Sequence, residues 1–65
     1  MTIRYFEDTD TLLIELKPGG VSETRDLDED TLLDLDTQGQ VLAITLEHAT
    51  ERAELGSFSF DRVAA

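Results

Sequence analysis

The chain has 65 residues, of which 15 are acidic and 5 are basic, and its formal net charge is −10. This length allows one small domain, residues 1–65, and the absence of cysteine excludes disulfides and thiolate metal sites. No apolar run approaches the roughly 20 residues of a membrane-spanning helix, and Met1–Tyr5 lacks the apolar core of a signal peptide. We therefore expect a cytoplasmic protein with no membrane partner, and the acidic balance argues against nucleic acid.

The first half of the chain predicts two strands and a weaker third. Residues 3–6 form the first strand and residues 11–16 the second, in which Leu12, Ile14 and Leu16 share one face. Proline and two glycines in residues 17–20 end that strand. Residues 21–27 alternate only weakly and are mostly polar, which is typical of an exposed edge strand.

Two more strands follow in the second half. Residues 31–36 place Leu33 and Leu35 on one face, and Leu32, Asp34 and Asp36 on the other. A turn at residues 37–40 uses Gly39 in the left-handed conformation. The strongest strand is residues 41–46, in which three apolar side chains share a face: Leu42, Ile44 and Leu46.

The end of the chain changes period. Residues 47–55 are rich in helix formers and precede Gly56, so they predict a short helix. Residues 57–65 are expected to form an apolar arm or a frayed tail. Within them, Ser57–Phe60 alternates and predicts either a short strand or an apolar arm, and Asp61–Ala65 are expected to fray. The predicted fold class is α+β: a small antiparallel sheet of four to five strands, with two hairpins at residues 3–16 and 31–46 and one short C-terminal helix packed on one face.

The order of these segments resembles a known family. The pieces are Tyr5, the acidic turn leading into Asp10-Thr11-Leu12-Leu13-Ile14-Glu15-Leu16, the segment Leu33-Asp34-Leu35-Asp36, and Gly39-Gln40-Val41-Leu42-Ala43-Ile44 followed by Ala49-Thr50. Over roughly residues 3–55 the chain resembles the prokaryotic domain-of-unknown-function family 2283. It departs from the family pattern at Phe6, Ala43 and Thr50, where aspartate, glycine and serine are usual. The resemblance implies a small β-rich fold with a helix and no established activity. Family members often lie beside toxin-like nuclease genes, which implies an antitoxin-like role.

Two acidic segments are candidate cation sites. Residues 34–39 match the start of a calcium loop, but its twelfth position is Thr45 instead of glutamate, and strands flank it where helices are required. A hairpin turn is the better interpretation. The acidic residues 26–30 are better read as a solvated loop. Asp34 and Asp36 share a strand face, but the chain is too short to enclose an acid–base pair in a cleft.

No catalytic or cofactor-binding set is visible. His48 is the only histidine, and the serines at positions 22, 57 and 59 lie in no nucleophile motif. Gly19-Gly20 lacks the lysine of a phosphate loop. We therefore expect no enzyme, no metal and no cofactor.

A small monomer with apolar side chains on both sheet faces predicts self-association, as a homodimer or a higher homo-oligomer. The expected oligomer contacts are the apolar residues left outside the predicted helix-covered face, together with the two aromatic residues of the arm: Phe6, Leu13, Leu32, Phe58 and Phe60. The expected surface for a basic protein partner is the dense acidic stretch: Asp26, Asp28, Glu29, Asp30, Asp34 and Asp36. The predicted function is a non-enzymatic, acidic protein-interaction domain, antitoxin-like toward a basic toxin. The alternative is a small-ligand or divalent-metal module that uses the acidic turns.

Overall fold

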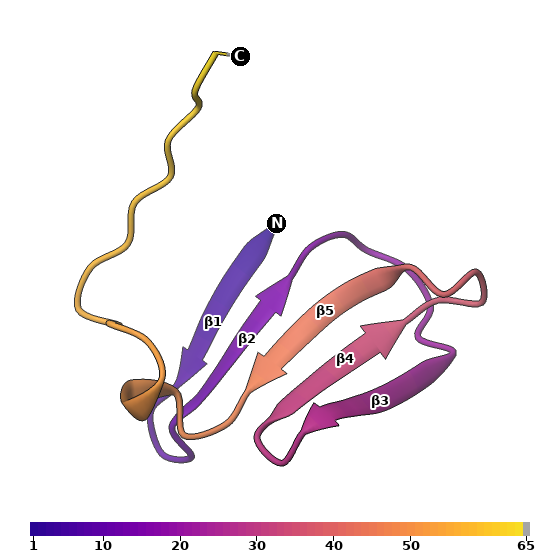
Figure 1. Ribbon diagram of the computed structural model, residues 1–65, viewed down its shortest axis with the longest axis horizontal. Coiled ribbons are helices and arrows are strands. Elements are labelled where there is room, and N and C mark those ends of the chain that lie inside the picture. The colour runs from indigo at the N-terminus through magenta and orange to yellow at the C-terminus, as the bar shows by residue number, and fades with distance from the viewer. Residues whose placement is uncertain (65) are drawn as a thin grey trace.

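The fold is a single antiparallel sheet. A computed structural model describes residues 1–64, and within that range the strands follow the spatial order β1-β2-β5-β4-β3 (Figure 1). Their bounds are Thr2–Phe6 for β1, Thr11–Glu15 for β2, Glu23–Asp28 for β3, Thr31–Leu35 for β4 and Val41–Leu46 for β5. The predicted antiparallel sheet is therefore confirmed, with β1 and the wholly exposed β3 as its edges.

The central pairing joins two halves that are distant in sequence. Tight turns connect β1 to β2, β3 to β4 and β4 to β5, whereas residues 16–22 carry the chain across one end of the sheet, from β2 to β3 (Figure 1). This crossing segment is held at both ends, because Leu16 N–H donates to the Leu42 carbonyl and Ser22 N–H donates to the Leu35 carbonyl, each at 2.8 Å. It packs closely, since a Cβ on Gly19 would lie 3.2 Å from Leu42 Cδ2.

One side of the sheet is apolar across four strands. Ile3 pairs with Ile14, Ile14 with Ile44, and Ile44 with Leu33, and directly paired residues project to the same side. The next row joins Tyr5, Leu12 and Leu46. We call this side the Ile face, and its apolar members are Ile3, Tyr5, Leu12, Ile14, Leu33, Ile44 and Leu46. This register confirms the predicted alternation at Leu12 and Ile14 in β2 and at Ile44 and Leu46 in β5. Leu16 lies beyond the end of β2, and Leu42 lies at a register shift without a directly paired residue.

The opposite side is mixed. Its central row joins Leu13, Thr45 and Leu32, and its charged members include Arg4, Glu15, Asp26 and Asp34. We call it the Leu13 face. Phe6 also lies on it, paired with Thr11 at the edge.

The predicted nine-residue helix is wrong. Only one 3-10 turn forms, η1 (Ala49–Glu51), and it begins after His48 in the left-handed conformation at φ 54°. That residue breaks any continuous helix from Glu47, whose N–H still donates to the Asp30 carbonyl at 2.8 Å as an extension of the sheet. An isolated segment of this length needs tertiary packing to stay helical, and Ala53 and Glu54 are exposed. Residues 1–64 contain no helix that is long and apolar enough to cross a membrane.

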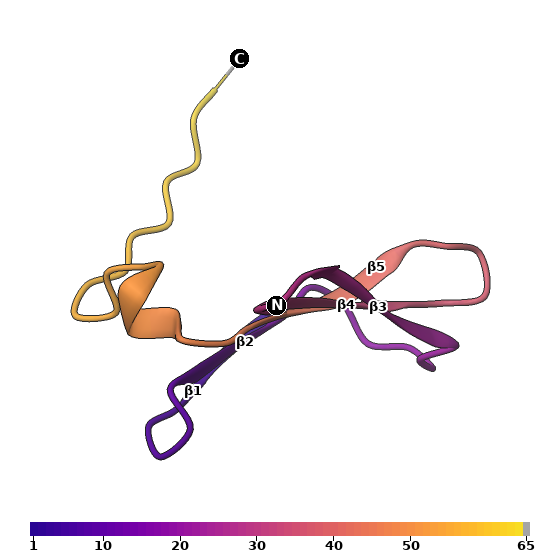
Figure 2. The same ribbon diagram turned by 60° about the horizontal axis from the view of Figure 1, so that its bottom comes forward.

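Residues 57–64, which we call the arm, leave the sheet as an extended segment (Figure 2). Of the two predicted states of Ser57–Phe60, strand or arm, the structure has the arm. Gly56 ends no helix. Ala65 lies outside the described residues.

The core of this single layer is thin. The buried apolar residues are Leu12, Leu35, Leu42, Ala43 and Ala49, and none of the isoleucines is fully buried. The radius of gyration is 13.0 Å, whereas a compact domain of this length has about 11 Å. One layer of secondary structure normally buries its apolar side against another, and this chain supplies no second layer within residues 1–64.

Candidate functional site

The Ile face is an apolar surface that the fold leaves accessible. Ile3 and Tyr5 on the edge strand are 40% and 36% exposed, and Ile14, Leu33 and Ile44 are only half-buried. A hollow of about 830 Å³ lies between the β1–β2 part of this face and the chain that follows η1. Apolar side chains dominate its lining, among them Met1, Ile3, Ile14, Leu55, Phe58 and Phe60.

The single chain exposes more surface than a compact monomer of the same mass. The accessible surface is 5138 Å² for a chain of 7.2 kDa, whereas a compact monomer of that mass exposes about 4,100 Å². The excess is about 1,000 Å², close to the roughly 800 Å² that each partner buries in a standard protein interface. Part of the excess belongs to the arm, and part belongs to the Ile face.

Asp10 anchors η1 to the β1–β2 turn. Its carboxylate accepts hydrogen bonds from Tyr5 O–H at 2.7 Å, from Thr50 Oγ1 at 2.7 Å and from Thr50 N–H at 3.1 Å. Its carbonyl accepts a fourth bond from Ala49 N–H at 2.9 Å. Asp10 itself has φ 53°, a left-handed conformation that aspartate tolerates better than most residues. We call this set the Asp10 anchor.

These contacts change the acidity of the two side chains at the anchor. The hydrogen bond from Tyr5, followed by that from Thr50, lowers the pKa of Asp10 below its usual value, because both stabilise the carboxylate. The same bond to Asp10 raises the pKa of Tyr5, since the neutral phenol is the donor. Both shifts follow from the hydrogen bonds of the Asp10 anchor.

A second anchor lies at the β3–β4 turn. The Arg52 guanidinium donates to the Asp30 carbonyl at 2.6 Å and to Thr31 Oγ1 at 2.5 Å, and Thr31 is almost fully buried. His48 Nδ1 lies 3.0 Å from Asp30 Oδ1. The hydrogen bond and the charge of Asp30 raise the pKa of His48, and Glu51 and Glu47 add to this effect. We call this set the Asp30 anchor.

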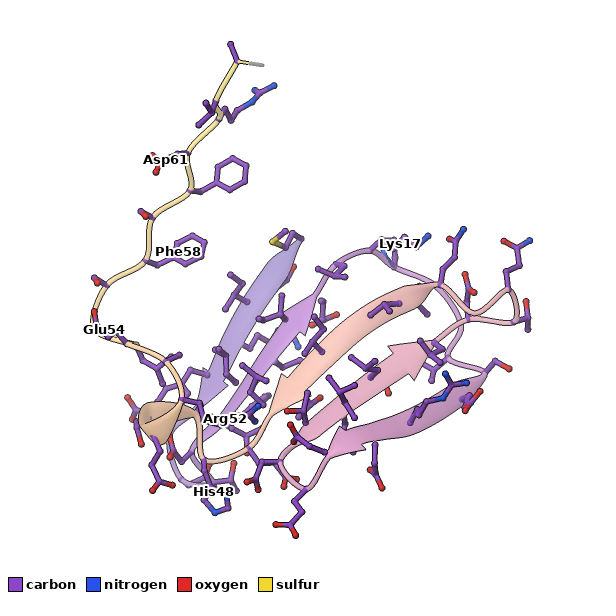
Figure 3. The ribbon with its side chains drawn as sticks, viewed as in Figure 1. Lys17, His48, Arg52, Glu54, Phe58 and Asp61 are labelled. Carbon is purple, nitrogen blue, oxygen red and sulfur yellow. The ribbon has the colours of Figure 1, made fainter. Side chains whose placement is uncertain are left out.

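The two anchors fix the place where the chain leaves the sheet. His48 and Arg52 lie beside the turns at one end of the sheet, and the arm departs beyond Glu54 (Figure 3). Because η1 is tied to both turns, the start of the arm is held on the side of the sheet that carries the Ile face, where it borders the hollow. Sequence reasoning missed this arrangement, although an aspartate at the end of a turn and directly before a strand is a recognisable signal for a left-handed position.

The acidic residues predicted to bind a partner do not form one patch. Asp28, Glu29 and Asp30 cluster at the β3–β4 turn, where Asp28 accepts from Asp30 N–H at 2.9 Å. That bond, followed by one from Thr31, lowers the pKa of Asp28. Asp26 and Asp34 lie on the Leu13 face.

The predicted pairing of Asp34 with Asp36 on one strand face is wrong. Asp34 accepts from Thr24 Oγ1 at 2.7 Å within the sheet. Asp36 lies beyond the end of β4, where its carboxylate accepts from Gln38 N–H at 2.8 Å and Gln40 N–H at 2.9 Å. The segment that partly matches a calcium loop is therefore a hairpin turn, closed by its own backbone donors and by Gly39 at φ 79°.

Metal-binding geometry is not found in the part of the chain that the structure describes, where no three His, Cys, Asp or Glu side chains converge.

The expected oligomer contacts divide between two sides: Phe6, Leu13 and Leu32 lie on the Leu13 face, whereas Phe58 and Phe60 border the hollow over the Ile face. The helix that was expected to cover one face is absent, so the Ile face stays open within the described residues.

Comparison with known proteins identifies a family and nothing narrower. No curated protein and no solved structure matches the chain. The profile of a family described as "Protein of unknown function (DUF2283)" matches residues 2–49, a range that covers all five strands and the start of η1. The chain belongs to the DUF2283 family.

Proposed function

We propose that this protein is a non-enzymatic interaction domain that works as a homodimer, with the Ile face as its assembly surface. The observation that carries the proposal is the open, single-layer sheet of a chain whose excess surface of about 1,000 Å², shared by the Ile face and the arm, is close to one side of a standard interface. A second copy supplies the missing layer, because two such sheets can pack face to face about 10 Å apart.

The composition of the two sheet faces favours the Ile face over the Leu13 face. Four strands contribute an uninterrupted apolar row to the Ile face, from Ile3 to Leu33, and a charge follows only at Arg25 on the far edge strand. The Leu13 face carries Arg4 and Glu15 close to its few apolar side chains. Burying those charges against a second copy would cost desolvation energy unless the copy supplied partners for them. The distribution of charge therefore directs the apolar side inward and the charged side to solvent.

A matched pair of substitutions on β1 tests this proposal. Ile3→Lys places a charge on the Ile face, whereas Thr2→Lys places the same charge on the neighbouring residue, which projects to the other side. Both positions are exposed in the single chain, so neither change removes a core contact. Size-exclusion chromatography with light scattering should show a dimer for the unaltered chain and for Thr2→Lys, and a monomer for Ile3→Lys. Equal dimerisation of the two variants would exclude the Ile face.

The acidic surface supports a second part of the proposal, an antitoxin-like complex with a basic protein. The net charge of −10 and the exposed Glu29 at the tip of an acidic turn would accelerate the approach of a basic partner. The test is co-purification with the product of the adjacent gene. A complex that forms at low salt and weakens steeply at high salt is expected, and Glu29→Gln should weaken it without changing the fold. A basic adjacent product that does not bind at low salt would contradict this part.

A further inference from the structure

The arm carries large apolar side chains, as a packed segment does, but these side chains are exposed to solvent. Phe58 and Phe60 are 73% and 71% exposed, and Val63 is 86% exposed. Single exposed apolar residues are ordinary, but two aromatic side chains two residues apart on one extended segment form a continuous apolar strip. Within residues 1–64, no backbone hydrogen bond ties positions 57–64 to the sheet.

The geometry places that strip beside a hollow that it does not fill. Phe58 projects from the side of the arm that faces β1 (Figure 3), and both aromatic residues border the hollow opposite Ile3, Tyr5 and Ile14. The arm then continues away from its own sheet (Figure 2). The chain thus forms two apolar walls with open space between them, a site that is incomplete in a single copy.

We propose that each arm packs on the sheet of a second copy, so that Phe58 and Phe60 cover the Ile3–Tyr5 end of the partner's Ile face. This proposal rests on the proposed function, because it assumes that the Ile faces of two copies meet. The reach is sufficient, since residues 57–63 span roughly 23 Å when extended and packed sheets lie roughly 10 Å apart. A two-fold axis makes the exchange reciprocal, so both hollows are filled by the same contact.

The area supports a second copy over other occupants. The excess surface includes both the Ile face and the arm, and together it matches one side of a standard interface. Aromatic residues are enriched in the cores of such interfaces and among the residues that dominate their energy. The two anchors hold Thr50 and Arg52, so the chain that leads into the arm starts from a fixed place at one end of the sheet.

Dimer dissociation constants test whether the arm contributes. The double variant Phe58→Ser/Phe60→Ser should weaken dimerisation roughly tenfold or more, as measured by sedimentation, whereas Ser57→Ala/Ser59→Ala should leave the constant unchanged. The two aromatic residues are exposed in the single chain, so this variant should fold normally. An unchanged constant for the phenylalanine variant would overturn the arm exchange. If that variant keeps the dissociation constant of the unaltered chain while Ile3→Lys is a monomer, the proposed function stands and only the arm contact fails.

Cross-linking distinguishes exchange from packing on the arm's own sheet. The chain has no cysteine, so Ser59→Cys can be introduced in a tagged chain and Ile3→Cys, on the Ile face beside the hollow, in an untagged chain. A short bis-maleimide should then join the two chains of different size. Linkage found only within a single chain that carries both substitutions would contradict the exchange.

Discussion

Asp10 combines a backbone role with a side-chain role. Its left-handed φ of 53° lets the β1–β2 turn end directly at the start of β2, and its carboxylate then collects donors from Tyr5 and Thr50. A residue without a carboxylate would leave those donors to water. One without tolerance for positive φ would strain the turn.

The first prediction separates these two roles. Asp10→Asn keeps a residue that tolerates the left-handed conformation but replaces one acceptor oxygen with a donor, whereas Asp10→Ala loses both functions. We expect both variants to have a lower melting temperature, with the larger loss for Asp10→Ala. Amide hydrogen exchange should show faster exchange at Thr50 in both. Normal protection of the Thr50 amide in Asp10→Ala would show that the anchor does not hold η1.

The second prediction concerns His48, which is also left-handed at φ 54° and faces Asp30, Glu47 and Glu51. Its pKa is raised in the folded chain, so the imidazolium is stabilised by folding. That contribution is complete below the usual pKa of 6.5 and is lost as the pH rises through the higher folded value. Urea unfolding of the unaltered chain and of His48→Asn, which tolerates the same backbone conformation, should therefore differ most under mildly acidic conditions.

The control for this measurement is Asp30→Asn, which removes the charge that raises the pKa. In that background the stability change caused by His48→Asn should lose most of its pH dependence. A stability difference that grows as the pH increases above neutrality would contradict the ion pair.

The lowered pKa values of Asp10 and Asp28 affect stability at acidic pH. The stabilisation that these carboxylates contribute is lost as the pH falls through their folded pKa values.

At the scale of the elements, the strands could be predicted from local pattern, whereas the end of the chain could not. The alternation of apolar and polar residues in β2 and β5 indicates which side of each strand is apolar. The register pairs those apolar residues directly, Leu12 with Leu46 and Ile14 with Ile44. The segment after β5 contains helix formers, but its conformation is decided by Asp10 and Asp30 from two distant turns. Hydrogen bonds between residues 18 to 40 positions apart leave no trace in local periodicity.

The same limit applies to the candidate surface. The apolar side chains of the Ile face could be listed from sequence, but their exposure followed only from the absence of the predicted helix. The division of the acidic residues between turns and faces also depends on topology, because β3 lies at the far edge from β2.

The third prediction compares two apolar residues of β5. Leu42 is 4% exposed within one chain, so Leu42→Ala should lower the free energy of unfolding by about 2–5 kcal/mol at any protein concentration. Ile44 is half-buried in one chain, so Ile44→Ala should lower the free energy of unfolding by about 1–2 kcal/mol in dilute solution. This loss should increase with protein concentration if a second copy buries Ile44.

Chemical denaturation at two widely separated protein concentrations checks this difference. A concentration-dependent cost for Ile44→Ala together with a constant cost for Leu42→Ala is expected. Equal and constant costs for both residues would mean that the Ile face stays open in solution.

At the scale of the whole molecule, burial of apolar surface favours dimerisation and the net charge opposes it. A net charge of −10 repels a second copy, and each apolar Å² removed from water contributes about 25 cal/mol. The Ile face can overcome that repulsion because its four-strand row is free of charged side chains from Ile3 to Leu33. Dimerisation should therefore tighten as salt screens the charges, since exposed charges more than about 8 Å apart are largely screened at physiological ionic strength.

Sedimentation equilibrium of the unaltered chain tests the central claim, that a second copy covers the Ile face, most directly. At tens of micromolar and physiological salt, we expect a mass of twice 7.2 kDa that falls toward the monomer value on dilution. A mass of 7.2 kDa at every concentration would contradict it.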